Sequence, residues 1–136
     1  MLRHGFELWH IAASDPDETT WRAAMAEMVA TYHQDATLDF SRTVPDFPIG
    51  NAVQGMTVWV ESARETFTDV RIEPTEIIDA GEAVAAGMHI TGKGALSGIG
   101  VDAEYFYVFR FGQGKIIAAT TYLTWRETLK AVGLAE

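Results

Sequence analysis

Four strand-like segments in the second half of the chain form two pairs, and this pairing constrains the fold more than any other feature. VRIEPTEIID and EAVAAGMHIT flank the turn-like DAGE, and VDAEYFYVFRF and KIIAATTYLTW flank GQG. β-Branched and aromatic residues bounded by short glycine-containing turns are typical of antiparallel hairpins. We therefore predict two long hairpins that span residues 70–125.

The first half of the chain carries helical patterns instead. Apolar residues recur at helical spacing in three sets: Leu2, Phe6, Trp9 and Ala13; Trp21, Met25, Met28 and Tyr32; Met56, Trp59, Ala63 and Phe67. We predict Asp15 as the N-cap of the second helix, with Pro16 in its first turn. The strand ATLDF and the irregular loop SRTVPDFPIGN follow, and a last short helix begins with Thr124 and Glu127 at capping-box spacing.

Helices followed by a run of antiparallel strands predict an α+β domain with the helices on one face of a curved sheet. The 136 residues, 48% of them hydrophobic, are typical of a single domain that spans residues 1–136. Cysteine is absent, which removes disulfides and thiolate chemistry and fits a cytoplasmic location. A net charge of −9 argues against nucleic acid and anionic membranes as partners. We expect neither a secretory nor a membrane-spanning segment.

Three segments resemble the SnoaL-like branch of the nuclear transport factor 2-like superfamily, which also contains ketosteroid isomerase and scytalone dehydratase. They are YHQDATLDFSR, VRIEPTEIIDAGEAV and FRFGQGKIIAATTYLTWRETLKAVGL, and the resemblance covers about Tyr32 to Leu134. It implies a cone-shaped roll, in which a strongly curved antiparallel sheet wraps around about three helices and leaves a deep, mostly apolar cavity. A short C-terminal helix closes the chain.

The family resemblance implies the fold but leaves the function open. Members include isomerases, dehydratases, epoxide hydrolases and polyketide cyclases, which generally work without a metal or organic cofactor, and also noncatalytic proteins. The resemblance therefore implies no cofactor and no metal for this chain. Dimers through the outer face of the sheet are common in the family, so we expect a homodimer.

Strand alternation decides which side chains face the predicted cavity. By similarity to ketosteroid isomerase, Tyr107 falls where that enzyme has its acidic oxyanion-hole donor, and His89 falls at a pocket-facing position of the neighbouring strand. We therefore predict that odd-numbered positions of both strands face inward. The even-numbered positions would form an apolar outer face that a second copy covers: Val84, Met88, Phe106 and Val108.

Three residues are candidates for catalysis. His89 has an unperturbed pKa of about 6.5, which suits general acid–base chemistry, and Tyr107, aided by Tyr105, could polarise a carbonyl or enolate oxygen. Phe40 stands where ketosteroid isomerase has its general base, which leaves Asp39 as the nearest acid. Asp39 is predicted to face away and to pair with Arg42 or cap the loop, although a register shift of one residue would turn it inward.

Ordinary structural roles are the alternatives for these residues: a buried histidine with satisfied hydrogen bonds, and tyrosines that simply suit a strand. The predicted ligand-binding residues are those expected to line the cavity: Phe40, Trp59, Ala85, Gly87, Tyr105, Phe109, Thr121 and Leu123. The small side chains of Ala85 and Gly87 would leave room for a ligand beside His89.

Two classes of function follow from these observations. The first is a pocket protein for a hydrophobic small molecule, cyclic or polyketide-like, which as an enzyme would be a cofactor-independent isomerase, cyclase or lyase. The second is a noncatalytic dimeric ligand-binding or interaction module of the same fold. His33, Asp35 and Asp39 lack a recognised metal-ligand spacing, and TGKGALSGIG joins two strands rather than opening a helix.

Overall fold

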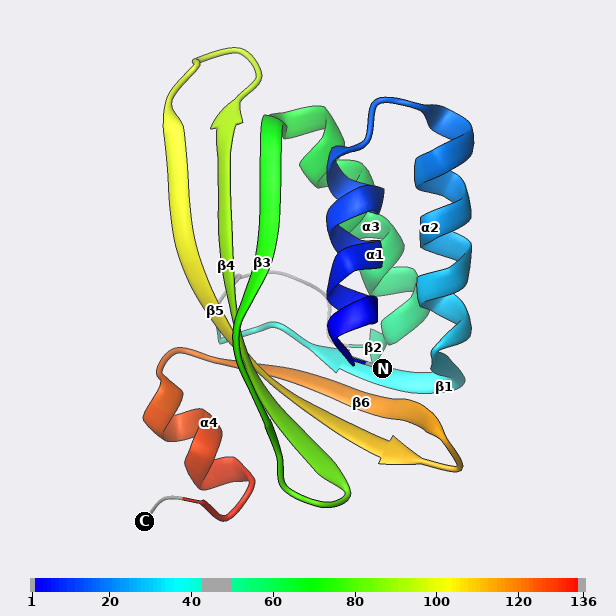
Figure 1. The fold of residues 1–136 in the computed structure, drawn as a ribbon, viewed down its shortest axis with the longest axis vertical. Helices are drawn as coiled ribbons and strands as arrows, with labels where there is room; N and C mark the ends of the chain where they lie inside the picture. Colours follow the sequence, from blue (N-terminus) through cyan, green and yellow to red (C-terminus); the bar gives the residue numbers. More distant parts are fainter. Residues whose placement is uncertain (1, 43–49, 135–136) are drawn as a thin grey trace.

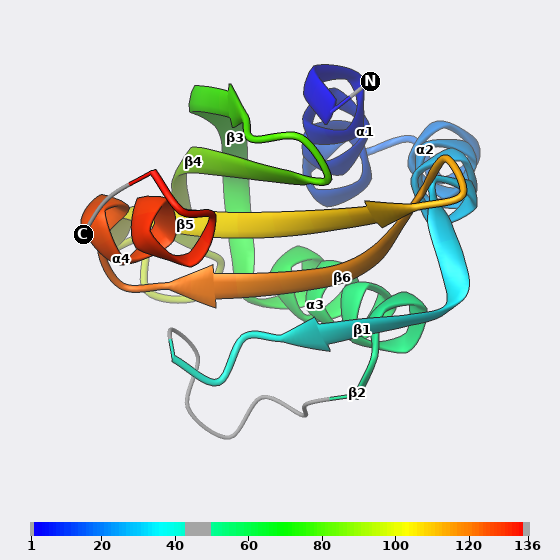
Figure 2. The same ribbon diagram turned by 90° about the horizontal axis from the view of Figure 1, so that it is seen from below.

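The described residues, 2–42 and 50–134 of a computed structural model, form a curved open sheet of six strands with three helices on one side and a shorter helix on the other (Figures 1 and 2). The elements in chain order are α1 (Leu2–Ser14), α2 (Glu18–Ala30), β1 (Tyr32–Asp39), β2 (Gly50–Asn51), α3 (Ala52–Thr66), β3 (Phe67–Asp79), β4 (Ala83–Gly94), β5 (Gly100–Gly112), β6 (Lys115–Tyr122) and α4 (Trp125–Ala131). The predicted α+β class is confirmed. Most of the predicted loop, residues 43–49, and the side chain of Leu2 lie outside the described part.

The strands lie in the order β2-β1-β6-β5-β4-β3. All neighbours are antiparallel except β1 and β6, which run parallel, so the sheet is mixed rather than purely antiparallel. The register of β3 against β4 shifts twice, between Thr68 and Arg71 and between Pro74 and Glu76. Such bulges bend a strand and increase its twist. The β3–β5 part of the sheet accordingly curves up beside α1 and α3 (Figure 1).

Local signals set most of the element ends. Thr124 caps α4 by accepting a hydrogen bond from the Glu127 backbone N–H at 3.1 Å, as the capping-box spacing predicts. The cap of α2 is Asp17 rather than the predicted Asp15. The Asp17 carboxylate accepts from both the backbone N–H and the hydroxyl of Thr20, whereas Asp15 accepts only the backbone N–H of Asp17. Within the described residues, no helix is long and apolar enough to cross a membrane.

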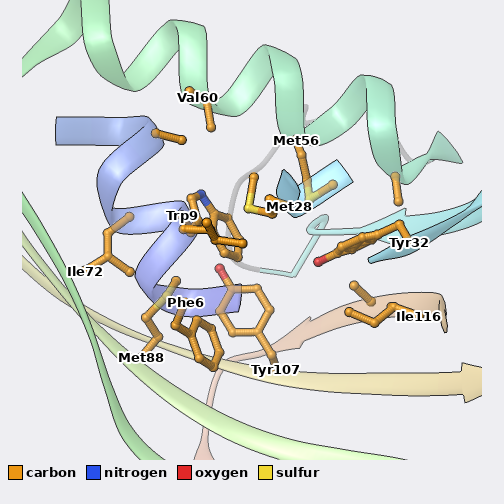
Figure 3. Packing of buried hydrophobic residues seen from close by; sticks show 14 of the residues in the cluster. Phe6, Trp9, Met28, Tyr32, Met56, Val60, Ile72, Met88, Tyr107 and Ile116 are labelled. Carbon is orange, nitrogen blue, oxygen red and sulfur yellow. The ribbon is translucent and has the colours of Figure 1, made fainter. Parts of the chain in front are cut away.

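The centre of the molecule is filled by aromatic side chains (Figure 3). The ring centroid of Trp9, from α1, lies 5.2 Å from that of Trp59 on α3 and 5.8 Å from that of Tyr107 on β5. Tyr107 also packs against Phe40 at 5.6 Å and Phe109 at 5.5 Å. These rings occupy the space that the sequence analysis assigned to a deep cavity.

The register of β4 against β5 corrects the predicted facing of β4. Ala86 pairs with Tyr107 and Met88 with Tyr105, so even-numbered positions of β4 share the helix-facing side with odd-numbered positions of β5. Directly paired residues lie on the same face of a sheet. His89 pairs with Glu104 and therefore lies on the opposite face. The prediction that odd-numbered residues of both strands face inward is wrong for β4.

The face of the sheet turned away from α1–α3 is partly covered by α4 (Figure 2). The ring of Trp125 packs against Phe106 at 5.9 Å, and the Arg110 guanidinium donates a hydrogen bond to the Ala131 carbonyl at 3.2 Å. Val108 is buried on this face. Of the predicted outer residues, Phe106 and Val108 do lie here, whereas Val84 and Met88 pair with inner residues of β5.

Candidate functional site

An apolar pocket of about 320 Å³ lies between α3 and the halves of β3, β4 and β5 next to the β4–β5 turn. Its lining residues come from those four elements: Val58, Trp59, Ser62, Ala63, Phe67, Val70, Ile90, Thr91, Gly92, Val101, Ala103 and Tyr105. The side chains at Ala63 and Ala103 are small, and Gly92 has none, so α3 and the sheet do not fill the space between them. The pocket is the strongest candidate for a functional site because concave, mostly apolar sites are the usual places for small ligands.

The polar groups of the pocket are uncharged. Ser62 and Tyr105 carry hydroxyls, the side chain of Thr91 shares the outer face of β4 with His89, and no Asp, Glu, His, Lys or Arg belongs to the described lining. Burying a charge without a partner costs far more free energy than burying a neutral group. The site is therefore suited to a neutral ligand, with hydroxyls that can either donate or accept a hydrogen bond.

The structure brings two of the predicted ligand-binding residues, Trp59 and Tyr105, to this pocket. Three others, Phe40, Phe109 and Thr121, are buried in the core instead. The remaining three lie elsewhere. The register of β4 places Ala85 and Gly87 on the outer face of the sheet. Leu123 lies between β6 and α4 and is exposed.

Tyr107 lies in the aromatic core and not in the pocket lining. Its side chain is 2% exposed, and Figure 3 shows the hydroxyl directed towards the interior near Trp9. Burial raises the pKa of Tyr107 well above its usual value because the phenolate would be desolvated. The hydroxyl therefore stays protonated across the physiological range.

His89 lies on the outer face of the sheet, where its side chain is 35% exposed. Its Nε2 is 2.6 Å from Oδ1 of Asp102, and Glu73 and Glu104 are its cross-strand neighbours. The bond to Asp102 raises the pKa of His89, and the charges of Glu104 and Glu73 raise it further. The prediction that His89 lies beside the cavity is wrong, because the register turns its imidazole away from the helices.

Asp39 ends β1 and is tied to the residues that follow it. The Ser41 hydroxyl and backbone N–H donate to Oδ1 at 2.6 and 3.0 Å, and Arg42 Nη1 lies 3.3 Å from Oδ2. These interactions, chiefly the bond from the Ser41 hydroxyl, lower the pKa of Asp39. A carboxylate with a lowered pKa is a weak base at neutral pH. The pairing with Arg42 agrees with the sequence analysis.

Several residues that line the pocket were not predicted from the sequence. Ser62 lies three residues after Trp59 and so on the same side of α3, which means that helical periodicity alone indicates it. Ile90 and Ala103 face each other across β4 and β5, and only the true register places that pair on the inner face.

Comparison with known proteins now defines the class. The family model of the SnoaL-like domain matches residues 17–119, so the chain belongs to the SnoaL-like domain family. A comparison with functionally curated proteins gave no match.

Solved structures with the same fold come from several bacteria. A nuclear transport factor 2-like protein of unknown function from Exiguobacterium sp. 255-15 is 14% identical, with a TM-score of 0.69 over 88% of this chain and 94% of the other. A SnoaL-like candidate polyketide cyclase from Jannaschia sp. CCS1 is 19% identical, with a TM-score of 0.64 over 99% and 90%. AclR, a candidate hydroxylase from Streptomyces galilaeus, is 15% identical, with a TM-score of 0.66 over 99% and 83%. At these identities the likeness shows the fold alone.

Proposed function

We propose that this SnoaL-like protein binds an uncharged, mostly apolar small molecule in the pocket between α3 and β3–β5. The observation that carries the proposal is the lining itself, in which apolar side chains lie beside the hydroxyl-bearing residues Ser62 and Tyr105 and the described residues contribute no charge. Membership of the family supports a small-molecule-binding or isomerase-type role. Two of the structural relatives are described as a candidate polyketide cyclase and a candidate hydroxylase, which supports a cyclic, oxygen-bearing ligand.

The size of the pocket supports a small ring system. The pocket has a volume of about 320 Å³. This lies at the lower end of the range for ligand pockets. A bicyclic ketone such as 1-tetralone fits this description and is a suitable probe.

Binding is proposed ahead of catalysis because the predicted catalytic residues are not brought together. His89 lies on the outer face, Tyr107 in the core and Asp39 at the end of β1. Within the described lining, Tyr105 is the one residue with an acidic or basic side chain. Isomerase-type chemistry needs a positioned general acid or base within hydrogen-bond reach of the ligand. The binding part of the first function, a pocket protein for a hydrophobic small molecule, is therefore better supported than its enzymatic part.

A variant that fills the pocket tests this proposal. Ala103→Leu places a larger side chain among the lining residues, so 1-tetralone should bind the variant at least about tenfold more weakly than the wild type. Ala118→Leu is the matched control, because Ala118 pairs with Arg110 on the outer face. Isothermal titration gives both affinities. The anion 1-naphthoate, of similar size, should bind the wild type much more weakly than the ketone does.

Two results would contradict the proposal. One is an equal affinity of Ala103→Leu and the wild type for 1-tetralone, which would place the ligand elsewhere. The other is the absence of saturable binding of 1-tetralone to the wild type.

A further inference from the structure

A buried polar atom without a partner lies directly behind the pocket. Trp9 is 2% exposed, and its Nε1 is the only buried side-chain nitrogen or oxygen of the described residues that has no hydrogen-bond partner there. Buried polar groups are nearly always hydrogen-bonded, because an unpaired one has lost its water and gained nothing in return. An indole N–H kept unpaired at the centre of the core therefore calls for an explanation.

One aromatic ring separates this donor from the pocket. The rings of Trp9 and Trp59 meet edge to face, with centroids 5.2 Å apart and an interplanar angle of 77°. Trp59 itself lines the pocket. Figure 3 shows the Trp9 nitrogen on the side of its ring that faces α3, the helix that carries Trp59. An aromatic ring is at most a weak acceptor, so the contact with Trp59 does not replace a true partner for the N–H.

Trp59 has room to move away from Trp9. Its side chain is only partly buried, and it borders the empty volume of the pocket. The residues one turn further along α3 on this side, Ser62 and Ala63, are small. A change of rotamer would move the Trp59 ring relative to Trp9 without a change in the backbone.

We propose that Trp9 Nε1–H donates a hydrogen bond to an oxygen of the bound ligand once Trp59 turns aside. The proposal rests on ligand binding in the pocket and narrows the class of ligand. An indole nitrogen donates and never accepts, so it selects a hydrogen-bond acceptor. The ligand therefore carries an acceptor oxygen, such as the carbonyl of a cyclic ketone or lactone, and is not a pure hydrocarbon.

The first test compares two probes that differ by one carbonyl group, 1-tetralone and tetralin. The chain has four tryptophans, so a ¹H–¹⁵N spectrum of the wild type resolves a small set of indole signals that can be assigned sequentially. Both probes should perturb the Trp59 indole. Only 1-tetralone should move the Trp9 Nε1 proton downfield, as expected for a new hydrogen bond to a carbonyl oxygen.

The second test removes the donor. Trp9→Phe should bind 1-tetralone about five- to tenfold more weakly than the wild type, the loss typical of one neutral hydrogen bond, and its affinity for tetralin should not fall by a comparable factor. Trp125→Phe is the matched control, since Trp125 packs on the outer face of the sheet. Benzothienylalanine at position 9 keeps the shape of the indole without the N–H, and it replaces Trp9→Phe if the smaller ring unfolds the protein.

The outcomes separate this inference from the proposed function. If both probes bind in the pocket, the Trp9 proton does not move and the donor-free variants keep full affinity for 1-tetralone, the inference is overturned while the proposed function stands. If neither probe binds the wild type, both are overturned. A loss confined to the ketone in the donor-free variants supports both.

Discussion

At the scale of single residues, the contact between His89 and Asp102 allows a test of the claim that the His89 side chain lies on the outer face of the sheet. The 2.6 Å contact with Asp102, together with Glu104 and Glu73, raises the pKa of His89 above the ordinary 6.5. Asp102→Asn should therefore lower the pKa of His89, which an NMR titration of the imidazole measures directly. His4 is the internal control, because its pKa is raised by Glu27 and Glu7 and should not respond.

The same pair sets the sign of a pH effect on stability. A histidine whose pKa is raised by folding stabilises the native state below its unfolded pKa, and this stabilisation is lost as the pH rises through the folded pKa. Asp102→Asn should therefore lower the Tm more at about pH 5.5 than at about pH 9. A pKa of His89 at or below about 6.5 in the wild type would contradict this account.

At the scale of elements, the facing of β4 makes Gly87 sensitive to substitution. A Cβ at Gly87 would lie 2.6 Å from the Thr75 hydroxyl and 3.6 Å from the Phe106 ring, both on the outer face. Thr75 is β-branched, so its χ1 angle is restricted and turning its hydroxyl away from a new methyl group costs free energy. Gly87→Ala should lower the free energy of unfolding by about 1–3 kcal/mol, measured by urea denaturation.

A second-site change identifies the cause. Thr75→Ala should restore most of the stability that Gly87→Ala removes. Gly92→Ala, on the same strand, is the control, because its Cβ would meet Thr68 and Val70 at an ordinary 3.5 Å. Failure of Thr75→Ala to restore stability would contradict the observed register.

The elements themselves were predictable because their signals are local. The Thr124 cap depends on a residue three positions away, and the turn between β5 and β6 needs only Gln113 and Gly114, which both have positive φ, at 54° and 78°. The facing of His89 was not predictable in this way. It depends on where two strands pair across a glycine-rich connection with no strong turn signal, and a shift of one residue there turns every side chain of β4 to the other face.

The pocket depends on still longer-range features. Helical periodicity was enough to predict that Trp59 lines a pocket. Val70 and Ile90 line the same pocket only because β3 is bulged and curved and because of the register in which β4 pairs with it. The filling of the centre by Trp9, Tyr107 and Phe109 likewise depends on how α1 lies across the sheet. Periodicity predicts that these apolar residues are buried. It does not predict which of them contact one another and which border a pocket.

At the scale of the whole molecule, the charged side chains and the apolar pocket lie apart. The chain carries a net charge of −9, yet the described lining of the pocket is neutral, and carboxylates such as Glu73, Asp102 and Glu104 gather on the opposite face around His89. Part of that face is covered by α4 of the same chain. A homodimer through the remaining part stays a prediction.

The most direct test of the account is a map of backbone and side-chain chemical shifts during titration with 1-tetralone. We predict saturable changes that cluster on Trp59 of α3, Ile90 of β4 and Ala103 and Tyr105 of β5, with the side-chain signals of His89 and Glu104 unaffected. Changes centred on His89 and Gly87, or no saturable changes at all, would contradict the claim that the pocket beside α3 is the ligand site.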